Sequence, residues 1–158
     1  MRPREVEVLL LANKLDFPTD RVCDQLRQLG TEFLRCNFDD MDKFRFILEP
    51  VKARLECKFE DTIWNVGNSL KSIWWRQPTF YRGTKIYNPT PAEQLYRSQW
   101  AAFMRSLIVF DNAKWFNHPA TTYQAEVKAY QLQKAYMCGF SVPETLITND
   151  DKAQVPTI

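Results

Sequence analysis

One short, nearly continuous apolar run near the start of the chain restricts the fold most strongly. The run is Val6-Glu-Val-Leu-Leu-Leu-Ala12, and Glu7 is its only polar residue. Strands with one wet face alternate apolar and polar residues, whereas strands covered on both faces are apolar throughout. The run therefore predicts a central strand of a parallel sheet.

A helix and a second strand are predicted directly after this run. Val22, Leu26 and Leu29 fall on one helical face. Gly30 is placed to end the helix in the left-handed conformation. An extended pattern resumes at Glu32-Phe-Leu-Arg-Cys-Asn37, so we expect two parallel strands joined by a right-handed crossover.

The middle of the chain has the alternating pattern of half-exposed strands. Phe44–Leu48 and Leu55–Phe59 alternate apolar with polar residues, which predicts a hairpin. Thr62–Val66 is a further strand candidate after the turn, and Ile73–Arg76 is another. Together with the first strands, these segments predict a three-layer α/β fold with a mainly parallel sheet and an added antiparallel hairpin.

Helix signals dominate the second half. Thr90 as N-cap, Pro91 at the first helical position and Glu93 three residues after the cap form a capping box, and the helix is expected to end near Phe110. Further on, the pattern predicts a short strand, a second long helix and a last strand. These elements are Lys114–Asn117, a helix from Thr121 or Thr122 to Gly139 with Ala125, Leu132, Ala135 and Tyr136 facing inward, and Val142–Thr148.

Charge and composition point to no nucleic acid and no membrane. The chain has 21 Lys and Arg against 19 Asp and Glu, with no long block of either sign. Its longest apolar run is too short for a bilayer span, and its start lacks the apolar core of a signal peptide, so we expect a cytoplasmic protein. The scattered cysteines and a single histidine disfavour zinc, and we interpret the cysteines as small buried hydrophobes.

Few residues qualify as catalytic or metal-binding groups. His118 has no Ser, Cys or Asp at a spacing that indicates a triad. Asp39, Asp40 and Asp42 follow the second predicted strand, where open α/β sheets collect ligand-binding loops. These carboxylates are interpreted either as a cation site or as a solvated loop or helix cap.

One stretch of the chain has a specific family resemblance. Its elements are Trp115-Phe-Asn-His-Pro119, Ala125, Lys128, Gln131-Leu132, Ala135, Gly139-Phe140, Val142-Pro143 and Thr145-Leu-Ile-Thr-Asn-Asp150, with Asn37-Phe-Asp-Asp40 and Trp74-Trp-Arg-Gln-Pro78 upstream. This pattern resembles the ATP-grasp maturases that cross-link ribosomally made peptides of the microviridin (graspetide) type. Gln77 stands where the family pattern has an arginine.

The resemblance covers the family's first, pre-ATP-grasp domain only. It implies that residues 1–150 form this domain and that residues 151–158 begin a linker to ATP-grasp domains outside the sequence. The implied reaction activates Asp or Glu side chains of a precursor peptide as acyl phosphates, which Ser, Thr or Lys side chains attack to give ester or amide rings. ATP and Mg²⁺ would serve the complete enzyme, with neither bound tightly by this domain alone, which we expect to be inactive by itself.

Two residues are candidates for binding. Lys128 matches a lysine that faces nucleotide phosphates in related ligases, although a solvated helix lysine fits equally. Asn117 and Pro119 are interpreted as turn-forming residues rather than ligands. Arg76 is the substrate-binding candidate within a mixed aromatic and basic segment that either holds an acidic peptide or packs in the core. The rest of this segment is Lys71, Trp74, Trp75, Phe80, Tyr81, Arg82, Lys85 and Tyr87.

Two other functions remain open. The chain can instead be a non-catalytic module that docks a leader peptide or a partner subunit, including a second copy of itself as a homodimer. A nucleotide-binding regulator ranks last, because neither G-x-G-x-x-G nor G-x-x-x-x-G-K-[ST] occurs in the sequence.

Overall fold

The computed structural model describes residues 2–76, 89–150 and 152–153. The chain divides into two compact units, Met1–His118 and Pro119–Ile158. Each unit is described by itself. The predicted boundary at residue 150 stays a prediction.

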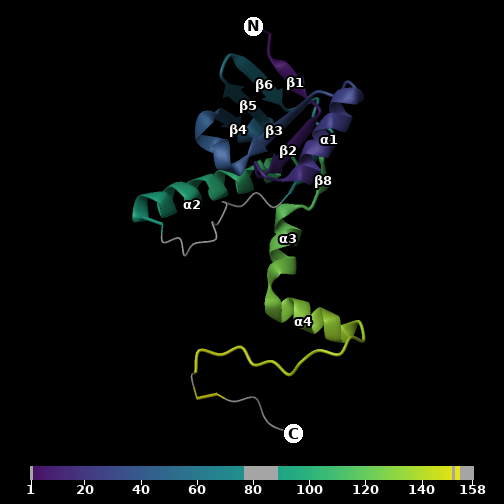
Figure 1. Ribbon diagram of the computed structural model, residues 1–158, viewed down its shortest axis with the longest axis vertical. Coiled ribbons are helices and arrows are strands. Elements are labelled where there is room, and N and C mark those ends of the chain that lie inside the picture. The colour runs from purple at the N-terminus through teal and green to yellow at the C-terminus, as the bar shows by residue number, and fades with distance from the viewer. Residues whose placement is uncertain (1, 77–88, 151, 154–158) are drawn as a thin grey trace. The chain divides into compact units, whose positions relative to one another are not determined.

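The first unit contains an all-parallel sheet of four strands (Figure 1). Its order is β3 (Phe33–Asn37), β2 (Val8–Ala12), β7 (Ser72–Trp75) and β8 (Lys114–Phe116). The helix α1 (Phe17–Gln28) connects β2 to β3, which confirms the predicted pair of parallel strands. Because all four strands run the same way, their carboxyl ends meet at one edge of the sheet.

A second sheet of four strands contains the predicted hairpin. Its order is β1 (Arg4–Val6), β6 (Thr62–Val66), β5 (Arg54–Phe59) and β4 (Arg45–Glu49). β5 is antiparallel to both β4 and β6, whereas β1 runs parallel to β6. The α/β class is therefore confirmed, but the hairpin lies in a separate sheet rather than at the edge of the parallel one.

The apolar run from Val6 to Ala12 is two strands, so its prediction as one strand is wrong. At Glu7 the chain leaves one sheet for the other. The Glu7 amide donates to the Glu32 carbonyl at 2.8 Å, and the Glu7 carbonyl accepts from the Lys71 amide at 2.8 Å. Hydropathy registers burial only, and Val6 at the end of β1 is as buried as the residues of β2, so the pattern does not show where the chain changes partners.

β2 is covered on both faces, as the apolar run predicts. Leu9 and Leu11 belong to the main core cluster, which also includes Leu55 and Cys57 of the second sheet. Leu10 and Ala12 point the opposite way and are buried outside that cluster. The parallel sheet thus packs against the second sheet on one face and is also buried on the other.

The helix α2 (Pro91–Ser106) begins with the predicted capping box. The Glu93 amide donates to Thr90 Oγ1 at 3.3 Å, and the Thr90 amide donates to the Glu93 carboxylate at 2.9 Å. Trp100 and Phe103 of α2 pack against Phe46 of the hairpin, with ring centroids 5.9 and 5.0 Å away. Short 3₁₀ turns occur at η1 (Phe38–Lys43), η2 (Pro50–Lys52) and η3 (Leu107–Val109), the last of which extends α2 towards Phe110.

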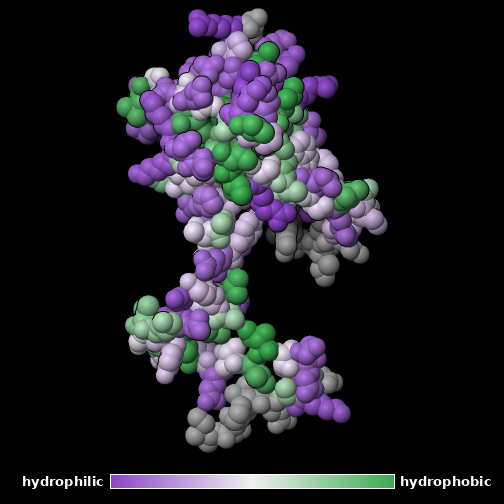
Figure 2. Space-filling view, turned by 180° about the vertical axis from the view of Figure 1, so that it is seen from behind, coloured by the Kyte–Doolittle hydropathy of each residue, from purple (hydrophilic) through white to green (hydrophobic). Residues whose placement is uncertain are grey.

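The second unit differs from its prediction. The expected long helix is two helices, α3 (Pro119–Glu126) and α4 (Lys128–Met137), with Val127 extended between them. Residues 142–148 form no strand, and Tyr136, expected to face inward, is 71% exposed. Apolar side chains stand at the surface of this unit in Figure 2. A strand needs a neighbouring strand, and a helix face is buried only against another surface. The local sequence pattern does not show whether either partner is present.

The thiols follow the prediction with one exception. Cys23, Cys36 and Cys57 are buried and free, whereas Cys138 is exposed. It follows the last residue of α4, where none of the helical side chains is buried. In the part of the chain that the structure describes, no helix has the length and apolar character needed to cross a bilayer.

Candidate functional site

Polar side chains gather where the parallel strands end. Each strand is followed at once by charged or amide residues, and the shared direction of the strands brings these residues to one edge of the sheet. We call this group the strand-end cluster. It consists of Asn13 and Lys14 after β2, Asp16 before α1, Asn37, Asp39 and Asp40 at and after β3, Arg76 after β7 and Asn117 after β8.

Asp40 is the charged centre of the cluster on the β3 side. Its carboxylate lies 3.0 Å from Lys14 Nζ and 2.6 Å from Lys43 Nζ, and its side chain is 13% exposed. Burial acts to raise the pKa of the Asp40 carboxyl, but hydrogen bonds from Lys43 and Lys14 outweigh burial and hold the pKa below its usual range. Asp40 therefore stays ionised at neutral pH and positions two lysines.

Asp39 supports the same arrangement, because its carboxylate accepts from the Lys14 amide at 2.8 Å. Asp42 is exposed. Among the described residues, no group of three or more His, Cys, Asp or Glu side chains is arranged to hold a metal ion. Asp40 thus forms ion pairs with neighbouring lysines, and Asp39 accepts a hydrogen bond from a backbone amide of the loop after β2.

Arg76 lies at the rim of the cluster. Its amide donates to the Leu11 carbonyl at 2.8 Å, which places the residue at the carboxyl end of β7. Its Nε lies 3.3 Å from Asp16 Oδ2 without hydrogen-bond geometry. The guanidinium carbon lies 6.0 Å from the Trp74 ring centroid, and the side chain is 37% exposed. This half-buried, oriented guanidinium suits a carboxylate or a phosphate.

Arg35 is a contributor that the sequence reasoning missed. Its side chain contacts three elements: it ion-pairs with Asp20 of α1, donates to Asn37 Oδ1 at 2.8 Å, and donates to the Asn13 carbonyl at 2.9 Å. A charged residue at the centre of a predicted strand was the available signal. Arg35 fixes the loops after β2 and β3 relative to α1.

The remaining sequence candidates have structural or separate positions. Asn117 has a positive φ of 63°, and its Nδ2 donates to the Trp75 carbonyl at 3.4 Å, in keeping with a turn-forming role. The His118 ring contacts Trp115, with centroids 5.1 Å apart. Lys128 belongs to the second unit, where it is exposed and its Nζ donates to Gln131 Oε1 at 3.1 Å. The predictions for the other members of the aromatic and basic segment lie outside the described residues; these members are Phe80, Tyr81, Arg82, Lys85 and Tyr87.

A largely apolar cavity of about 440 Å³ adjoins the cluster. Five of its lining residues are polar and belong to, or contact, the strand-end cluster, and the other five form an apolar wall. The polar residues are Lys14, Arg35, Asn37, Asp40 and Lys43, and the apolar ones are Phe33, Leu34, Phe44, Phe59 and Trp64. Sequence reasoning missed this cavity, because its walls come from both sheets.

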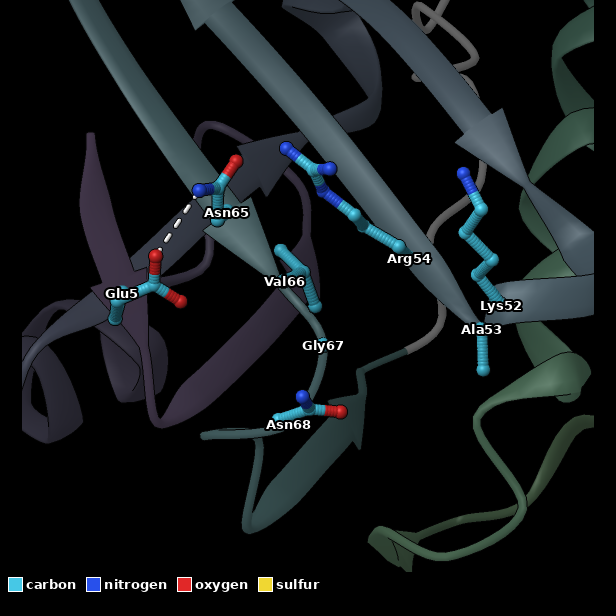
Figure 3. A pocket seen from close by; sticks show the side chains of 8 residues that line it. All are labelled: Glu5, Lys52, Ala53, Arg54, Asn65, Val66, Gly67 and Asn68. Carbon is cyan, nitrogen blue, oxygen red and sulfur yellow. Dashed lines mark hydrogen bonds between the residues drawn. The ribbon is translucent and has the colours of Figure 1, made fainter.

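A second hollow, of about 340 Å³, is polar and lies at the start of β5 and the end of β6 (Figure 3). Figure 3 shows Asn65 donating to Glu5, a bond of 3.0 Å. Lys52 is ion-paired with Glu49, and Arg54 Nη1 lies 3.7 Å from the same carboxylate. Because Glu49 offsets these cations, the hollow is less suited to an anion than the strand-end cluster.

The fold places the cluster where open α/β domains bind their ligands. In such domains ligands bind in the crevice outside the carboxyl ends of the parallel strands, which is the position of the strand-end cluster. No protein-family model matches the chain, and no curated protein matches it in sequence.

Solved structures share the fold. Macrocyclase MdnB from Microcystis aeruginosa MRC matches 94% of this chain with a TM-score of 0.66 and 23% identity. Macrocyclase MdnC from the same organism, bound with precursor peptide MdnA, matches 92% with a TM-score of 0.74 and 17% identity. The ATP-grasp ligase PsnB, complexed with precursor peptide PsnA2 and AMPPNP, matches 95% with a TM-score of 0.55 and 19% identity.

The chain spans about half the length of these proteins, 48% of MdnB and of MdnC and 50% of PsnB. At these identities the likeness shows the fold alone, which this chain shares with about half of each of these proteins. The resemblance predicted from the sequence is thereby confirmed at the level of the fold.

Proposed function

We propose that this chain is the pre-ATP-grasp part of an ATP-dependent ligase that cross-links side chains within a ribosomally made precursor peptide. The observation that carries the proposal is the fold shared over more than nine tenths of the chain with MdnB, MdnC and PsnB. Two of these structures contain a precursor peptide, and one contains AMPPNP. This likeness supports our proposal of a peptide partner and of ATP use by the complete enzyme.

The chemistry requires activation of a carboxylate. ATP supplies the phosphoryl group that converts an Asp or Glu side chain of the peptide into an acyl phosphate. A hydroxyl or amine of the peptide then forms an ester or amide bond as phosphate leaves. Among the described residues, Arg76 is suited to bind an anionic group of this reaction, such as a peptide carboxylate. We propose Lys128 as a contact to phosphate. The described residues offer no arrangement for Mg²⁺, so no magnesium ligand is assigned to them.

Arg76 is proposed to bind the peptide. Asp16 lies beside its Nε and also accepts from Thr19 Oγ1 at 2.6 Å, so the carboxylate next to the guanidinium is itself held in place. The exposed part of the guanidinium faces solvent at the strand ends. An acidic side chain of a precursor peptide is the complementary group.

The second unit is proposed to pack against further protein. α4 has no buried side chain, although it carries large apolar residues such as Tyr136 and Met137. Such exposure usually marks an interaction surface. The remaining ATP-grasp domains are the partner that the proposed function supplies, and a second copy of the chain is the alternative.

The test is ring formation by the protein that contains this chain. We would incubate it with Mg-ATP and the precursor peptides MdnA and PsnA2, and measure the loss of one water per ring by mass spectrometry. Arg76→Ala is expected to reduce ring formation about tenfold or more, as loss of a charged hydrogen-bond donor does. Arg45→Ala, on the outward face of β4, is the matched control.

Each outcome has a clear meaning. ATP-dependent ring formation that Arg76→Ala weakens and Arg45→Ala leaves intact supports the proposal. Peptide binding without any ATP-dependent mass change would instead favour the non-catalytic docking module. Unchanged ring formation in Arg76→Ala or Lys128→Ala would remove that residue from the site.

A further inference from the structure

We propose that the apolar cavity beside β3 binds an extended peptide segment in which a bulky apolar side chain is next to an acidic one. This inference rests on the proposed function, because it assigns a docking position to the peptide partner. The cavity is called the β3 cavity below. Neither the role proposed for the strand-end cluster nor the family resemblance gives the β3 cavity a function.

The walls of the β3 cavity are aromatic and incompletely covered. Phe33, Phe44, Phe59 and Trp64 all line it, and each is only half-buried. Phe59 and Trp64 lie on the inward face of the second sheet, the face that also carries the buried Cys57. A volume of about 440 Å³ within this wall is large enough for one bulky side chain, and filling it would remove apolar surface from water.

The backbone beside the cavity is that of an edge strand. β3 is the last strand of its sheet, and among the described residues no strand pairs with its outer side. Four of the five residues of β3 line the cavity, namely Phe33, Leu34, Arg35 and Asn37. An extended peptide can add to such an edge through main-chain hydrogen bonds while one side chain enters a neighbouring pocket. The structure therefore favours an extended occupant.

The rim charges favour an acidic neighbour. Lys14, Lys43 and Arg35 line the cavity against the single carboxylate of Asp40. Arg35 is held by Asp20, but the side chains of Lys14 and Lys43 are more than half exposed although both contact Asp40. A carboxylate of the peptide, next to the inserted side chain, would give these two lysines a second ion-pair partner besides Asp40.

Two variants test the wall without removing core contacts. Phe33 and Phe59 line the cavity but do not belong to the side chains that pack against the main core cluster, whereas Phe44 and Trp64 do. Phe33→Ala and Phe59→Ala should therefore preserve the fold, which circular dichroism checks. Ile47→Ala is the control, because Ile47 is an exposed apolar residue on the outward face of the second sheet.

The experiment is fluorescence anisotropy of labelled hexapeptides with the 158-residue chain. The probes are Thr-Thr-Phe-Asp-Thr-Thr and versions with Ala for Phe or Lys for Asp, all with blocked termini. We expect Phe33→Ala and Phe59→Ala each to weaken binding of the first probe about tenfold, as truncation of an interface aromatic residue does. The two altered probes should bind the unmodified chain weakly, whereas Ile47→Ala should bind the first probe as the unmodified chain does.

The proposal would be overturned if the unmodified chain bound all three probes equally. It would also be overturned if Phe33→Ala and Phe59→Ala bound the first probe as tightly as the unmodified chain does. A third result would overturn it as well. If light scattering shows that the unmodified chain forms concentration-dependent dimers, that Phe33→Ala dissociates them and that no probe binds, the occupant of the cavity is a second copy of the chain. The assay needs no ATP. Failure here therefore leaves the ligase proposal intact, and selective binding without ATP-dependent ring formation would refute the ligase proposal alone.

Discussion

Replacing Asp40 by Asn removes a charge at the strand-end cluster while keeping the shape of the side chain. Asp40 is nearly buried and accepts hydrogen bonds from two lysines, at 3.0 and 2.6 Å. A hydrogen bond to a charged group contributes about 1.5–3 kcal/mol, and an exposed ion pair about 0–1 kcal/mol. Both lysines are more than half exposed, so solvent screens them, and we expect a loss of about 1–2 kcal/mol in the free energy of unfolding at pH 7.

The pH dependence gives the sharper test. Because the pKa of Asp40 is lower in the folded chain, its stabilisation is complete above the unfolded value of about 4 and is lost as the pH falls through the folded value. The difference in the free energy of unfolding between Asp40→Asn and the unmodified chain, measured in urea, should therefore be larger at pH 7 than at about pH 3. Asp42→Asn, at an exposed position nearby, is the control. A difference that is equal at both pH values would refute the assigned role of the charge.

Three further predictions concern the fold. Leu11→Ala should lower the free energy of unfolding by about 2–5 kcal/mol, measured by urea unfolding, because Leu11 is fully buried between the two sheets; a loss below about 1 kcal/mol would contradict this packing. Thr90→Ala should cost about 1 kcal/mol by removing the capping box, with a matching fall in melting temperature. Thr90→Asp should retain most of that stability, and equal losses in both variants would reject the cap. In the folded chain a maleimide should label Cys138 quickly and the three buried thiols only after denaturation; rapid labelling of all four would show that the core is open.

Local chemistry determined a large part of this fold. The capping box at Thr90 depends on residues within one helical turn, so it was predictable. The hairpin of β4 and β5 and the pairing of β2 with β3 follow from alternation and from a helix between two strands. The resemblance to ATP-grasp maturases was likewise carried by residues close in sequence, and the fold agrees with it.

Predictions failed where a distant partner decides the structure. Val6–Ala12 is apolar enough for one strand, but it divides between two sheets at Glu7, whose amide donates to Glu32 and whose carbonyl accepts from Lys71. Residues 142–148 have a strand-like sequence, yet a strand exists only when another strand pairs with it, and none does so among the described residues.

The candidate site divides in the same way. The sequence placed Asp40 after the second predicted strand and Arg76 at the end of another, and parallel pairing brought both to one edge together with Lys14. Only the tertiary structure decided that Lys43 contacts Asp40 and that an aromatic cavity opens beside β3. Hydropathy along the chain reports whether a side chain is buried, whereas a cavity depends on which surfaces face each other across sheets.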